Sequence, residues 1–478
     1  MNALELYEKG AEALKQGKDI DAFSYFKQSA KLKYTPAIDE LGSCYYHGTG
    51  VKKNYQKAFN LYLEAALEGN ASAMYDVACC YENGEGINRN YKLALQWHEK
   101  AASEGNIDAL ETLGDWYLVG TGHIKKDYSK AFSLYLEAAN KGSITAKNSI
   151  GFCYEHGKGV EKNYPAAFKW YTEAANEKNA DGQTSVGDFY FDGIEIEKDL
   201  EKAVYWYKQA AEQGDAYGQY RLAECYYEGT GIEQDYERCL YWHQKAAEQG
   251  YKDSLFCLGE TYFYGDGVEI DYKKAFEYYK MAIDDDLPEA IYSVGWCYKK
   301  GLGIRKNYKK AFYYFERSAK LGYPYAMDCL GYAYQYGQGI EKDSNQSIYW
   351  YKKAARKNIK LAQYSVGYYY GQLKDYKNAL HWYKKAAIQN DDDAQVMIGY
   401  QYHYGLGVKQ NDKKAVYWYT LAAKQENKRA EYNLGLCYLY GEGVKKDLNQ
   451  AKYWFECAAN QGHKKAKVKL LKLSSNDA

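Results

Sequence analysis

The sequence predicts an all-α protein, a solenoid of about twelve helix-turn-helix units with a cap at each end. Two observations support this prediction. A glycine-centred segment recurs every 36 residues over most of the chain, as at Gly48, Gly84 and Gly120. On both sides of that segment, apolar residues follow the spacing of one helix face. A period of this length is typical of arrays in which each hairpin packs only on its neighbours.

Residues 218–250 show the pattern of one unit. The first half spaces small and apolar residues at i, i+4, i+7 and i+8, as on one face of a helix: Gly218, Leu222, Cys225 and Tyr226. A break follows at Gly229-Thr-Gly231, where paired glycines supply backbone angles that other residues reach only at a cost. A second helical pattern ends before Gly250, which occupies a C-cap position. The unit therefore predicts a helical hairpin with a glycine-rich tip.

The repeat divides the chain without linkers. Residues 1–36 have a tip four residues shorter than the others and predict a tetratricopeptide-like capping hairpin. Nine units follow over 37–361, a short tetratricopeptide-like unit over 362–393, and two more units over 394–462. Residues 463–478, rich in Lys and Leu, predict a capping helix with a frayed tail; a basic helix on a membrane surface is the alternative.

Two further tips depart from the pattern. After Gly120 the step lengthens to 37, because His123 follows the second tip glycine before the usual Val or Ile. The tip at Gly193 has Glu195 where other units have the second glycine. Both departures lie in the turn, where changes of length and composition are tolerated best. They leave the helical pattern on either side intact.

The combination of motifs in each unit is specific. One unit carries Leu258-Gly259 and Tyr262 in its first helix, Gly265-Asp-Gly267-Val at its tip, and Lys274-Ala275 in its second helix. A chain with this combination, in phase from about Pro36 to Gly462, resembles the Sel-1-like repeat family, which is related to the tetratricopeptide repeats. The resemblance implies a right-handed α/α superhelix that binds proteins or peptides, usually as an adaptor.

Composition limits the class of partner and the compartment. Lys plus Arg and Asp plus Glu are both 63, so the formal net charge is +0, which argues against a nucleic-acid binder. No apolar run suits a secretory signal or a membrane span, and we expect a cytoplasmic protein, although specialised secretion leaves no trace that this reasoning would detect. The 11 cysteines recur at equivalent helix positions and predict small buried thiols rather than disulfides.

We find no pattern that predicts catalysis. The Gly-x-Gly tips join two helices and lack the preceding strand of a dinucleotide-binding loop. The 8 histidines are scattered and form neither a zinc-finger spacing nor an H-E-x-x-H pair. We therefore expect a protein that is not an enzyme and that has no cofactor, no metal site and no catalytic residue.

One face of the first helices is not explained by packing between units. On each first helix, the residues three before, one after, and four or five after the glycine of the Leu-Gly pair lie on the side opposite the buried stripe. In tetratricopeptide-like superhelices this face is concave, and it should be polar unless it binds something. In the first half the face is largely acidic, with Asp115, Asp188, Glu224 and Glu260 among its residues. In the second half it is aromatic, with Phe256, Tyr264, Tyr292, Trp296, Tyr332, Tyr336, Tyr364, Tyr368, Tyr400, Tyr404, Tyr432 and Tyr440.

These residues predict a groove that binds a protein or peptide partner, since Tyr and Trp dominate binding hot spots. An extended segment with basic and apolar or proline residues would suit it. The competing interpretation is that superhelical curvature buries the rings, in a chain that contains 58 tyrosines. The leading functional prediction is a non-catalytic adaptor or scaffold. A small-molecule-binding or hydrolytic repeat protein and a bacterial effector or host-interaction protein are the alternatives.

Overall fold

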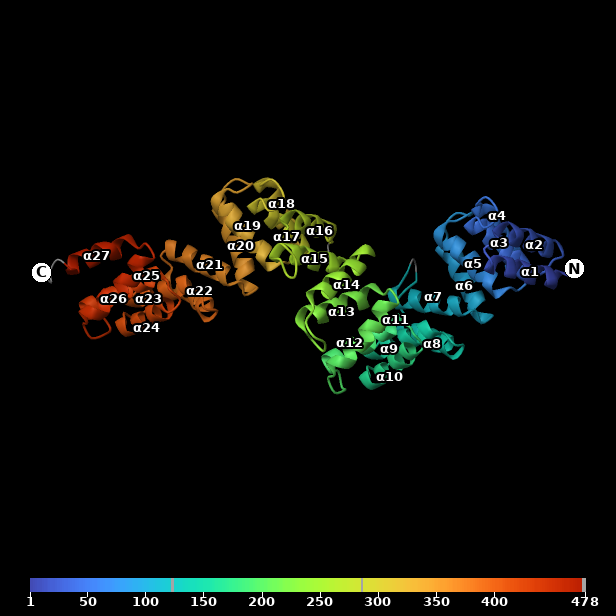
Figure 1. The fold of residues 1–478 in the computed structure, drawn as a ribbon, viewed down its shortest axis with the longest axis horizontal. Helices are drawn as coiled ribbons and strands as arrows, with labels where there is room; N and C mark the ends of the chain where they lie inside the picture. The colour runs from blue at the N-terminus through green and yellow to red at the C-terminus, as the bar shows by residue number, and fades with distance from the viewer. Residues whose placement is uncertain (122–123, 285–286, 475–478) are drawn as a thin grey trace. The chain divides into compact units, whose positions relative to one another are not determined.

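The structure, a computed structural model, describes residues 1–121, 124–284 and 287–474 and is all-α. Within these ranges it contains 27 helices, and the only β-type pairing is an isolated bridge between Asp284 and Leu287. Within each of the two compact units described below, consecutive helices pair as antiparallel hairpins, and each hairpin packs on the next (Figure 1). The predicted solenoid of helix-turn-helix units is confirmed. The residues that lengthen the third tip, Gly122 and His123, lie outside the described ranges.

The chain forms two compact units, Met1–Gln249 and Gly250–Ala478. The helices of the N-terminal unit are α1 (Ala3–Lys15), α2 (Asp19–Lys31), α3 (Thr35–His47), α4 (Tyr55–Leu67), α5 (Ala71–Asn83), α6 (Tyr91–Ser103), α7 (Ile107–Val119), α8 (Tyr128–Asn140), α9 (Ile144–His156), α10 (Tyr164–Asn176), α11 (Ala180–Asp192), α12 (Leu200–Glu212), α13 (Ala216–Glu228) and α14 (Tyr236–Glu248). Odd-numbered helices are the first helices of their hairpins, and even-numbered helices are the second.

The C-terminal unit continues the same alternation. Its helices are α15 (Lys252–Tyr264), α16 (Tyr272–Met281), α17 (Pro288–Lys300), α18 (Tyr308–Lys320), α19 (Pro324–Tyr336), α20 (Ser344–Arg356), α21 (Lys360–Gln372), α22 (Tyr376–Ile388), α23 (Asp392–Tyr404), α24 (Asp412–Ala423), α25 (Lys428–Tyr440), α26 (Leu448–Asn460) and α27 (Lys464–Ser474). The last helix, α27, packs on α26 and buries Ala466 there. None of the described helices combines the length and the apolar character needed to cross a membrane.

Capping residues set the ends of the helices. Helix α8 begins after Asp127, whose carboxylate accepts a hydrogen bond from the backbone N–H of Lys130 at 3.0 Å. Helix α9 ends at Gly157, which closes the helix in the left-handed conformation with φ of 64°. The same two devices recur in most hairpins. Glu195, where the second tip glycine is missing, adopts φ of 51°, so this non-glycine residue still follows the path of the turn.

The second tip glycine contacts the preceding hairpin. A Cβ atom built on Gly159 would lie 2.0 Å from the backbone oxygen of Tyr128, at the start of α8. Gly303 stands in the same relation to Tyr272. In contrast, a Cβ atom on Gly157, the first glycine of its tip, would meet nothing closer than 3.5 Å. The two glycines of one tip therefore have different functions: the first ends a helix, and the second allows close contact between successive hairpins.

The Leu-Gly glycine of each first helix packs against an aromatic ring of its own second helix. A Cβ atom on Gly187 would lie 2.5 Å from the ring of Tyr207, and Gly151 and Tyr171 make the same contact. We call these residues the repeat glycines: Gly42, Gly114, Gly151, Gly187, Gly259, Gly295, Gly331, Gly367, Gly399 and Gly435. Two hairpins have alanine at this position, Ala78 and Ala223. Both have histidine in place of the tyrosine or phenylalanine, at His98 and His243, and both histidines are buried. The smaller ring leaves room for the extra methyl group.

We expect this size compensation to appear as coupling between Ala78 and His98. His98→Tyr alone should destabilise the hairpin by about 1 to 3 kcal/mol, because the ring collides with the methyl group of Ala78. Ala78→Gly alone should cost about 1 kcal/mol, because glycine weakens a helix. In the double variant the new phenol ring can pack as Tyr171 packs on Gly151. Local stability is measured by hydrogen exchange in helices α5 and α6. If the losses of stability caused by the two single substitutions simply added in the double variant, the prediction would be contradicted.

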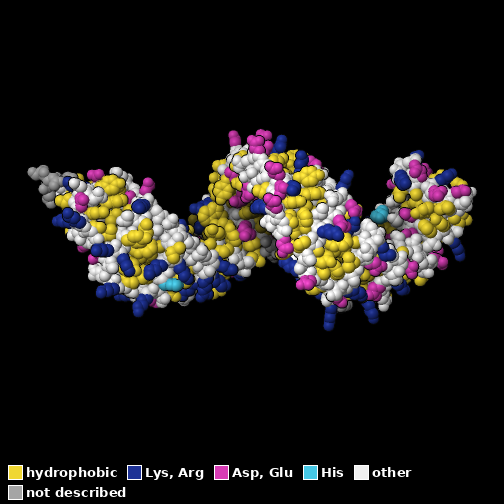
Figure 2. Space-filling view, turned by 90° about the horizontal axis from the view of Figure 1, so that it is seen from below, with side chains coloured by type: hydrophobic (Ala, Val, Ile, Leu, Met, Phe, Trp, Pro, Cys, Tyr) yellow, Lys and Arg dark blue, Asp and Glu magenta, His cyan; other side chains and the backbone are white. Residues whose placement is uncertain are grey.

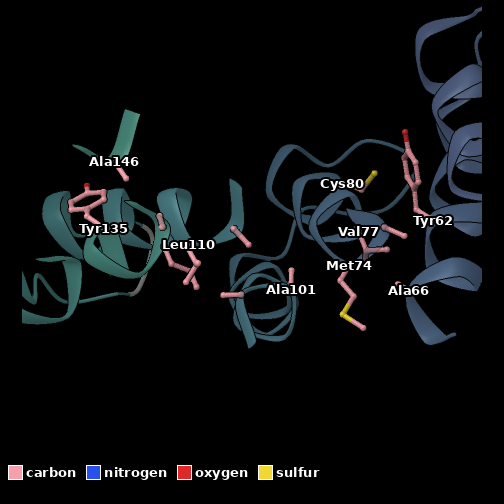
Figure 3. Packing of buried hydrophobic residues seen from close by; sticks show 14 of the residues in the cluster. Tyr62, Ala66, Met74, Val77, Cys80, Ala101, Leu110, Tyr135 and Ala146 are labelled. Carbon is pink, nitrogen blue, oxygen red and sulfur yellow. The ribbon is translucent and has the colours of Figure 1, made fainter. Parts of the chain in front are cut away.

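The buried core runs continuously from one hairpin to the next within each unit. Figure 3 shows part of it, with Tyr62, Met74, Val77, Leu110 and Tyr135 contributed by three successive hairpins. The cysteines are all free, and most are buried as predicted. Burial raises the pKa of Cys80 to about 12 and that of Cys153 to about 11. Such thiols stay protonated near neutral pH and serve as small apolar side chains.

Glutamine side chains join the two helices of a hairpin and also reach the preceding hairpin, which was not predicted from the sequence. Gln213, at the C-cap of α12, donates a hydrogen bond to Gln183 at 2.7 Å, and Gln183 donates to the carbonyl oxygen of Ala175 at 3.2 Å. Gln249 and Gln219 repeat the contact at 3.0 Å. In the C-terminal unit it recurs between Gln389 and Gln363, Gln425 and Gln395, and Gln461 and Glu431. These hydrogen bonds satisfy amide groups that are buried between hairpins.

Candidate interaction surface

The surface predicted from the sequence lies along the row of first helices. We call it the inner face and define it by the positions three before, one after and four or five after each repeat glycine or its alanine equivalent. Within the N-terminal unit the first helices approach one another directly, as α11 and α13 do where the Arg221 Nη1 atom lies 2.5 Å from the Asp188 Oδ1 atom. The inner-face positions of α11 and α13 therefore belong to one surface.

The structure leaves none of the predicted aromatic residues fully buried. Their exposure depends on their position in the repeat. At five residues after the repeat glycine, Tyr264 is 62% exposed and Tyr336 is 52% exposed. Tyr404 and Tyr440 occupy the same position in their repeats and are also exposed. The positions one after the glycine hold Trp296, Tyr332, Tyr368 and Tyr400, of which the three tyrosines are 37% to 43% exposed.

The rings three before the repeat glycine have a different environment. Phe256, Tyr292, Tyr364 and Tyr432 are half-buried, and each packs on a buried ring of its own second helix. The ring centroids of Tyr364 and Tyr383, for example, lie 5.7 Å apart. These four residues therefore support the hairpin as well as line its surface. The residues most available to a partner are those one and five after the glycine.

Two first helices of the C-terminal unit, α19 and α23, carry pairs of exposed rings. The centroids of Tyr332 and Tyr336 are 4.4 Å apart, and those of Tyr400 and Tyr404 are 4.5 Å apart. Figure 2 shows hydrophobic side chains, tyrosine included, exposed in patches on one side of the molecule. Tyr400, Tyr404 and Tyr440 also line a cavity of about 220 Å³. Side chains that pair in this way present flat, amphipathic walls to a ligand.

The acidic residues of the inner face hold buried hydroxyl groups and rings in place. The hydroxyl of Tyr135 donates to Asp115 at 2.6 Å, and that of Tyr207 donates to Asp188 at 2.7 Å. Glu260 accepts in the same way from Tyr279, and the Oε1 atom of Glu224 lies 3.2 Å from the Nε2 atom of His243. A buried hydroxyl needs such a partner. The predicted acidic residues are thus part of the repeat architecture, which the sequence analysis did not foresee.

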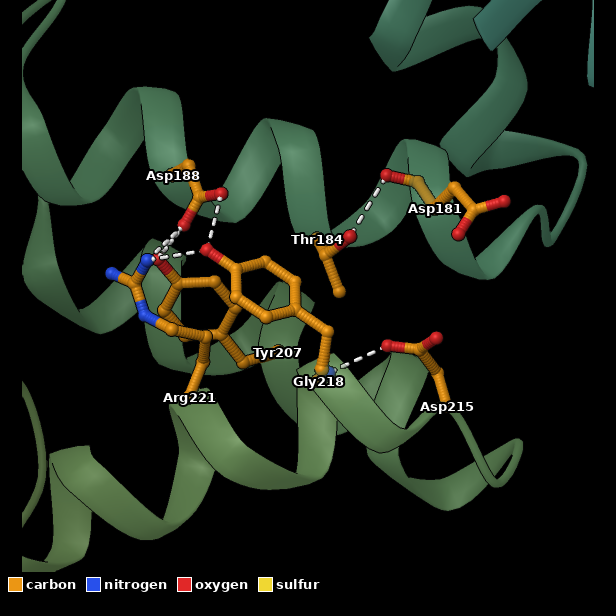
Figure 4. A network of polar contacts seen from close by, with 8 residues as sticks. Asp181, Thr184, Asp188, Tyr207, Asp215, Gly218 and Arg221 are labelled. Carbon is orange, nitrogen blue, oxygen red and sulfur yellow. Dashed lines mark hydrogen bonds and ion pairs between the residues drawn. The ribbon is translucent and has the colours of Figure 1, made fainter. Parts of the chain in front are cut away.

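Around Asp188 the acidic position also links two hairpins (Figure 4). Asp188 accepts hydrogen bonds from Tyr207, from Arg221 and from the hydroxyl of Tyr217 at 3.1 Å. Burial raises the pKa of the Asp188 carboxyl, and the positive charge of Arg221 opposes that shift. Arg221 and Tyr217 line a cavity of about 350 Å³ together with Phe191 and Tyr220. The carboxylate is held by three partners and has little capacity left for a ligand.

Basic residues beside the inner face were not placed there by the sequence alone. Arg429, Lys464, Lys465 and His463 border a cavity of about 410 Å³ beside Tyr400 and Tyr432. The run of lysines in residues 463–478 was visible in the sequence and was assigned to a cap. Its proximity to the tyrosines of α23 and α25 depends on how α27 packs, and only the structure shows it.

The fold defines a class: an α/α repeat protein in which successive helical hairpins of each unit pack on one another. The sequence profile described as Sel1 repeat matches thirteen stretches of the chain: 3–34, 35–70, 71–106, 107–143, 145–179, 180–215, 216–251, 253–287, 288–323, 324–359, 360–391, 392–427 and 428–463. The protein belongs to the Sel1 repeat family. The matches include residues 3–34 and 360–391, the two stretches with short tips.

Solved structures agree with this assignment. A protective antigen present in uropathogenic Escherichia coli strains, which displays an SLR (Sel1-like repeat) fold, is 29% identical, with a TM-score of 0.60 over 95% of this chain and 91% of its own. A Sel1 repeat protein from Oxalobacter formigenes is 28% identical, with a TM-score of 0.49 over 66% of this chain and 90% of its own. A comparison with curated proteins finds no match.

Proposed function

We propose that the protein is a non-catalytic adaptor that binds an extended protein segment along the inner face of its C-terminal unit. One observation carries the proposal: seven tyrosines at two equivalent repeat positions remain 37% to 62% exposed, although packing between hairpins does not require them there. Solvation alone favours polar residues at such positions. Repeated aromatic rings on neighbouring first helices can contact successive side chains of an extended peptide.

A second row of exposed tyrosines provides an internal comparison. Tyr313, Tyr349 and Tyr417 lie on the second helices and are 47% to 58% exposed. Each packs edge-on against the next residue, a tyrosine or tryptophan, as Tyr349 does on Trp350 at 5.2 Å. They occur singly, whereas the inner-face tyrosines pair and line cavities. The inner row therefore suits a binding surface better than the outer row.

The test compares these two rows. Partners are first captured with the full-length protein from its source organism and identified by mass spectrometry. We expect Tyr332→Ala, Tyr368→Ala and Tyr400→Ala together to weaken binding about 100-fold or more, because each ring should contribute about 1 kcal/mol or more. Helicity measured by circular dichroism should stay unchanged, since all three rings are partly exposed.

The matched control carries the same three changes on the outer row, at Tyr313, Tyr349 and Tyr417. It removes the same number of tyrosine side chains and should leave binding within about threefold of wild type. Binding that survives the inner changes but not the outer ones would place the interaction on the second helices and contradict the proposal.

A further inference from the structure

The zero net charge of the chain conceals opposite charges on its two units. The N-terminal unit, Met1–Gln249, contains 27 Lys and Arg against 38 Asp and Glu, a formal charge of −11. The C-terminal unit, Gly250–Ala478, contains 36 Lys and Arg against 25 Asp and Glu, a formal charge of +11. The unit with the aromatic inner face is therefore strongly basic, and its surface favours anionic ligands.

On the inner face of the C-terminal unit this positive charge lies at two places. Lys299 and Lys300, four and five residues after Gly295 on α17, each lie 5.0 Å from the ring of Trp296. The larger group lies at the C-terminal end. Helices α19, α21 and α23, which carry most of the exposed tyrosine pairs, contain a single Lys or Arg residue, Lys360. Beyond them, basic side chains from α25 and α27 border two cavities. One, of about 410 Å³, is bordered by Arg429, Lys464 and Lys465, and the other, of about 280 Å³, by Lys464, Lys465, Lys469 and Lys472. Tyr432 lines both cavities.

Few acidic groups compensate the charges of Arg429, Lys464, Lys465 and Lys469. Arg429 lies 3.8 Å from an oxygen of Asp393, and both side chains are exposed. The ammonium group of Lys469 donates to the hydroxyl of Tyr440 at 3.0 Å rather than to a carboxylate. Within the described ranges Lys464 and Lys465 have no ion-pair partner. Burial lowers the pKa of His463, and the charges of Lys428, Lys465 and Arg429 lower it further, as expected in a positive environment.

The geometry favours a peptide over a membrane or a nucleic acid. A membrane-surface helix needs an exposed apolar face, but Leu470 and Leu473 of α27 pack against the last hairpin. Only Val468 and Leu471 are well exposed there. A single-stranded nucleic acid needs cations all along the row of rings to contact successive phosphates, but α19, α21 and α23, between Lys300 and the basic end, contain only Lys360. Aromatic walls with a basic end suit a peptide that is apolar in one part and acidic in another.

We propose that the cavities between α23, α25 and α27 bind the acidic part of an extended peptide, whose apolar or aromatic residues contact the tyrosine pairs of α19, α21 and α23. This inference rests on the proposed adaptor function and specifies its partner. The partner is expected to be acidic here, whereas the sequence alone suggested a basic one. The acidic residues behind that suggestion are held by tyrosine, histidine and arginine side chains of the protein itself. Binding should weaken as salt concentration rises.

The experiment selects ligands for the immobilised full-length protein from a random dodecapeptide display library. We expect enriched peptides to combine Asp or Glu with aromatic or aliphatic residues. The test variant carries Arg429→Glu, Lys465→Glu and Lys469→Glu and should bind those peptides at least about tenfold more weakly in fluorescence anisotropy. The matched control, Lys309→Glu, Lys384→Glu and Lys413→Glu, makes the same change in net charge on second helices and should bind them normally.

The outcomes separate the two proposals. Enriched peptides that need Tyr332, Tyr368 and Tyr400 but carry no excess of acidic residues would overturn the acidic partner and leave the adaptor function standing. No enrichment, or enrichment that is indifferent to those tyrosines, would overturn both. Equal losses in the test variant and its control would show a general charge effect and also refute the site. Binding of anionic phosphatidylglycerol vesicles or of a labelled oligouridylate, lost in the test variant alone, would assign the basic end to a lipid or a nucleic acid instead.

Discussion

Gly159→Ala is expected to destabilise the repeats around α8 and α9 by about 3 kcal/mol, far more than Gly157→Ala in the same tip. A methyl group on Gly159 would lie 2.0 Å from the backbone oxygen of Tyr128. A backbone atom cannot move aside as a flexible side chain can, so the hairpins would have to separate, which costs about 1 to 3 kcal/mol. The left-handed conformation, with φ of 75°, adds about 1 kcal/mol for any other residue.

Gly157→Ala is the matched control because its φ of 64° is also left-handed, while its nearest contact would be 3.5 Å away. This variant should lose only the stability that a left-handed backbone costs a residue other than glycine, about 1 kcal/mol. Urea unfolding followed by circular dichroism, with hydrogen exchange of α8 and α9 to locate the effect, measures both variants. Similar losses of stability in the two variants would show that the second tip glycine is needed only for the backbone conformation of its own turn. That result would contradict its role in the contact between hairpins.

The second large effect concerns pH. Asp39 and Asp76 lie on neighbouring first helices, α3 and α5, with Glu40, Asp108 and the Tyr62 hydroxyl nearby. Burial, followed by the negative charge of Asp39, raises the pKa of Asp76 to about 8. Burial and the charge of Glu40 raise the pKa of Asp39 to about 6. A carboxyl whose pKa is raised by folding favours the folded state while it is protonated.

The stability of these hairpins should therefore fall as pH rises. The stabilisation is complete below the usual carboxyl pKa of 3.8 and is lost as pH rises through about 8. We expect the hairpins of α3 to α6 to lose about 2 to 4 kcal/mol between pH 5 and pH 9, since one pKa unit corresponds to about 1.4 kcal/mol. Asp76→Asn keeps a neutral group of the same shape and should remove most of that dependence.

Hydrogen exchange of α3 and α5, corrected for the intrinsic effect of pH on exchange, measures this stability in the full-length protein. The variant should be more stable than wild type at pH 9 and similar to it at pH 5. Helices α9 and α10 serve as the internal control, because they do not contact this pair. Parallel pH profiles for wild type and Asp76→Asn would contradict a buried, proton-sharing pair.

Much of the architecture follows from the sequence, for a physical reason. The 36-residue period, the helical spacing on either side of each tip and the glycine at most first-helix ends are local signals, and they depend on residues a few positions apart. They were sufficient to predict the hairpins, the free and mostly buried cysteines such as Cys80 and Cys153, and the exposed side of the first helices on which Tyr336 and Tyr404 lie.

Relations between positions 16 to 36 residues apart required the tertiary structure. The fit between Ala78 and His98, the hydrogen bond from Tyr207 to Asp188, and the glutamine contacts such as that between Gln213 and Gln183 join residues on different helices. The basic end of the inner face is a similar case. The lysines of α27, which the sequence alone assigns to a solvated cap, lie beside Tyr432 and Tyr440 of α25 in the structure.

The sequence by itself therefore determined the unit of this protein: a helical hairpin with a two-glycine tip, repeated in phase, with tyrosines on a face that packing leaves free. Only the tertiary structure decided which polar groups of that face are already engaged and which remain available to a partner. The reason is physical: helix periodicity fixes the direction of a side chain along its own helix, but its hydrogen bonds and electrostatic environment depend on neighbours brought close by packing.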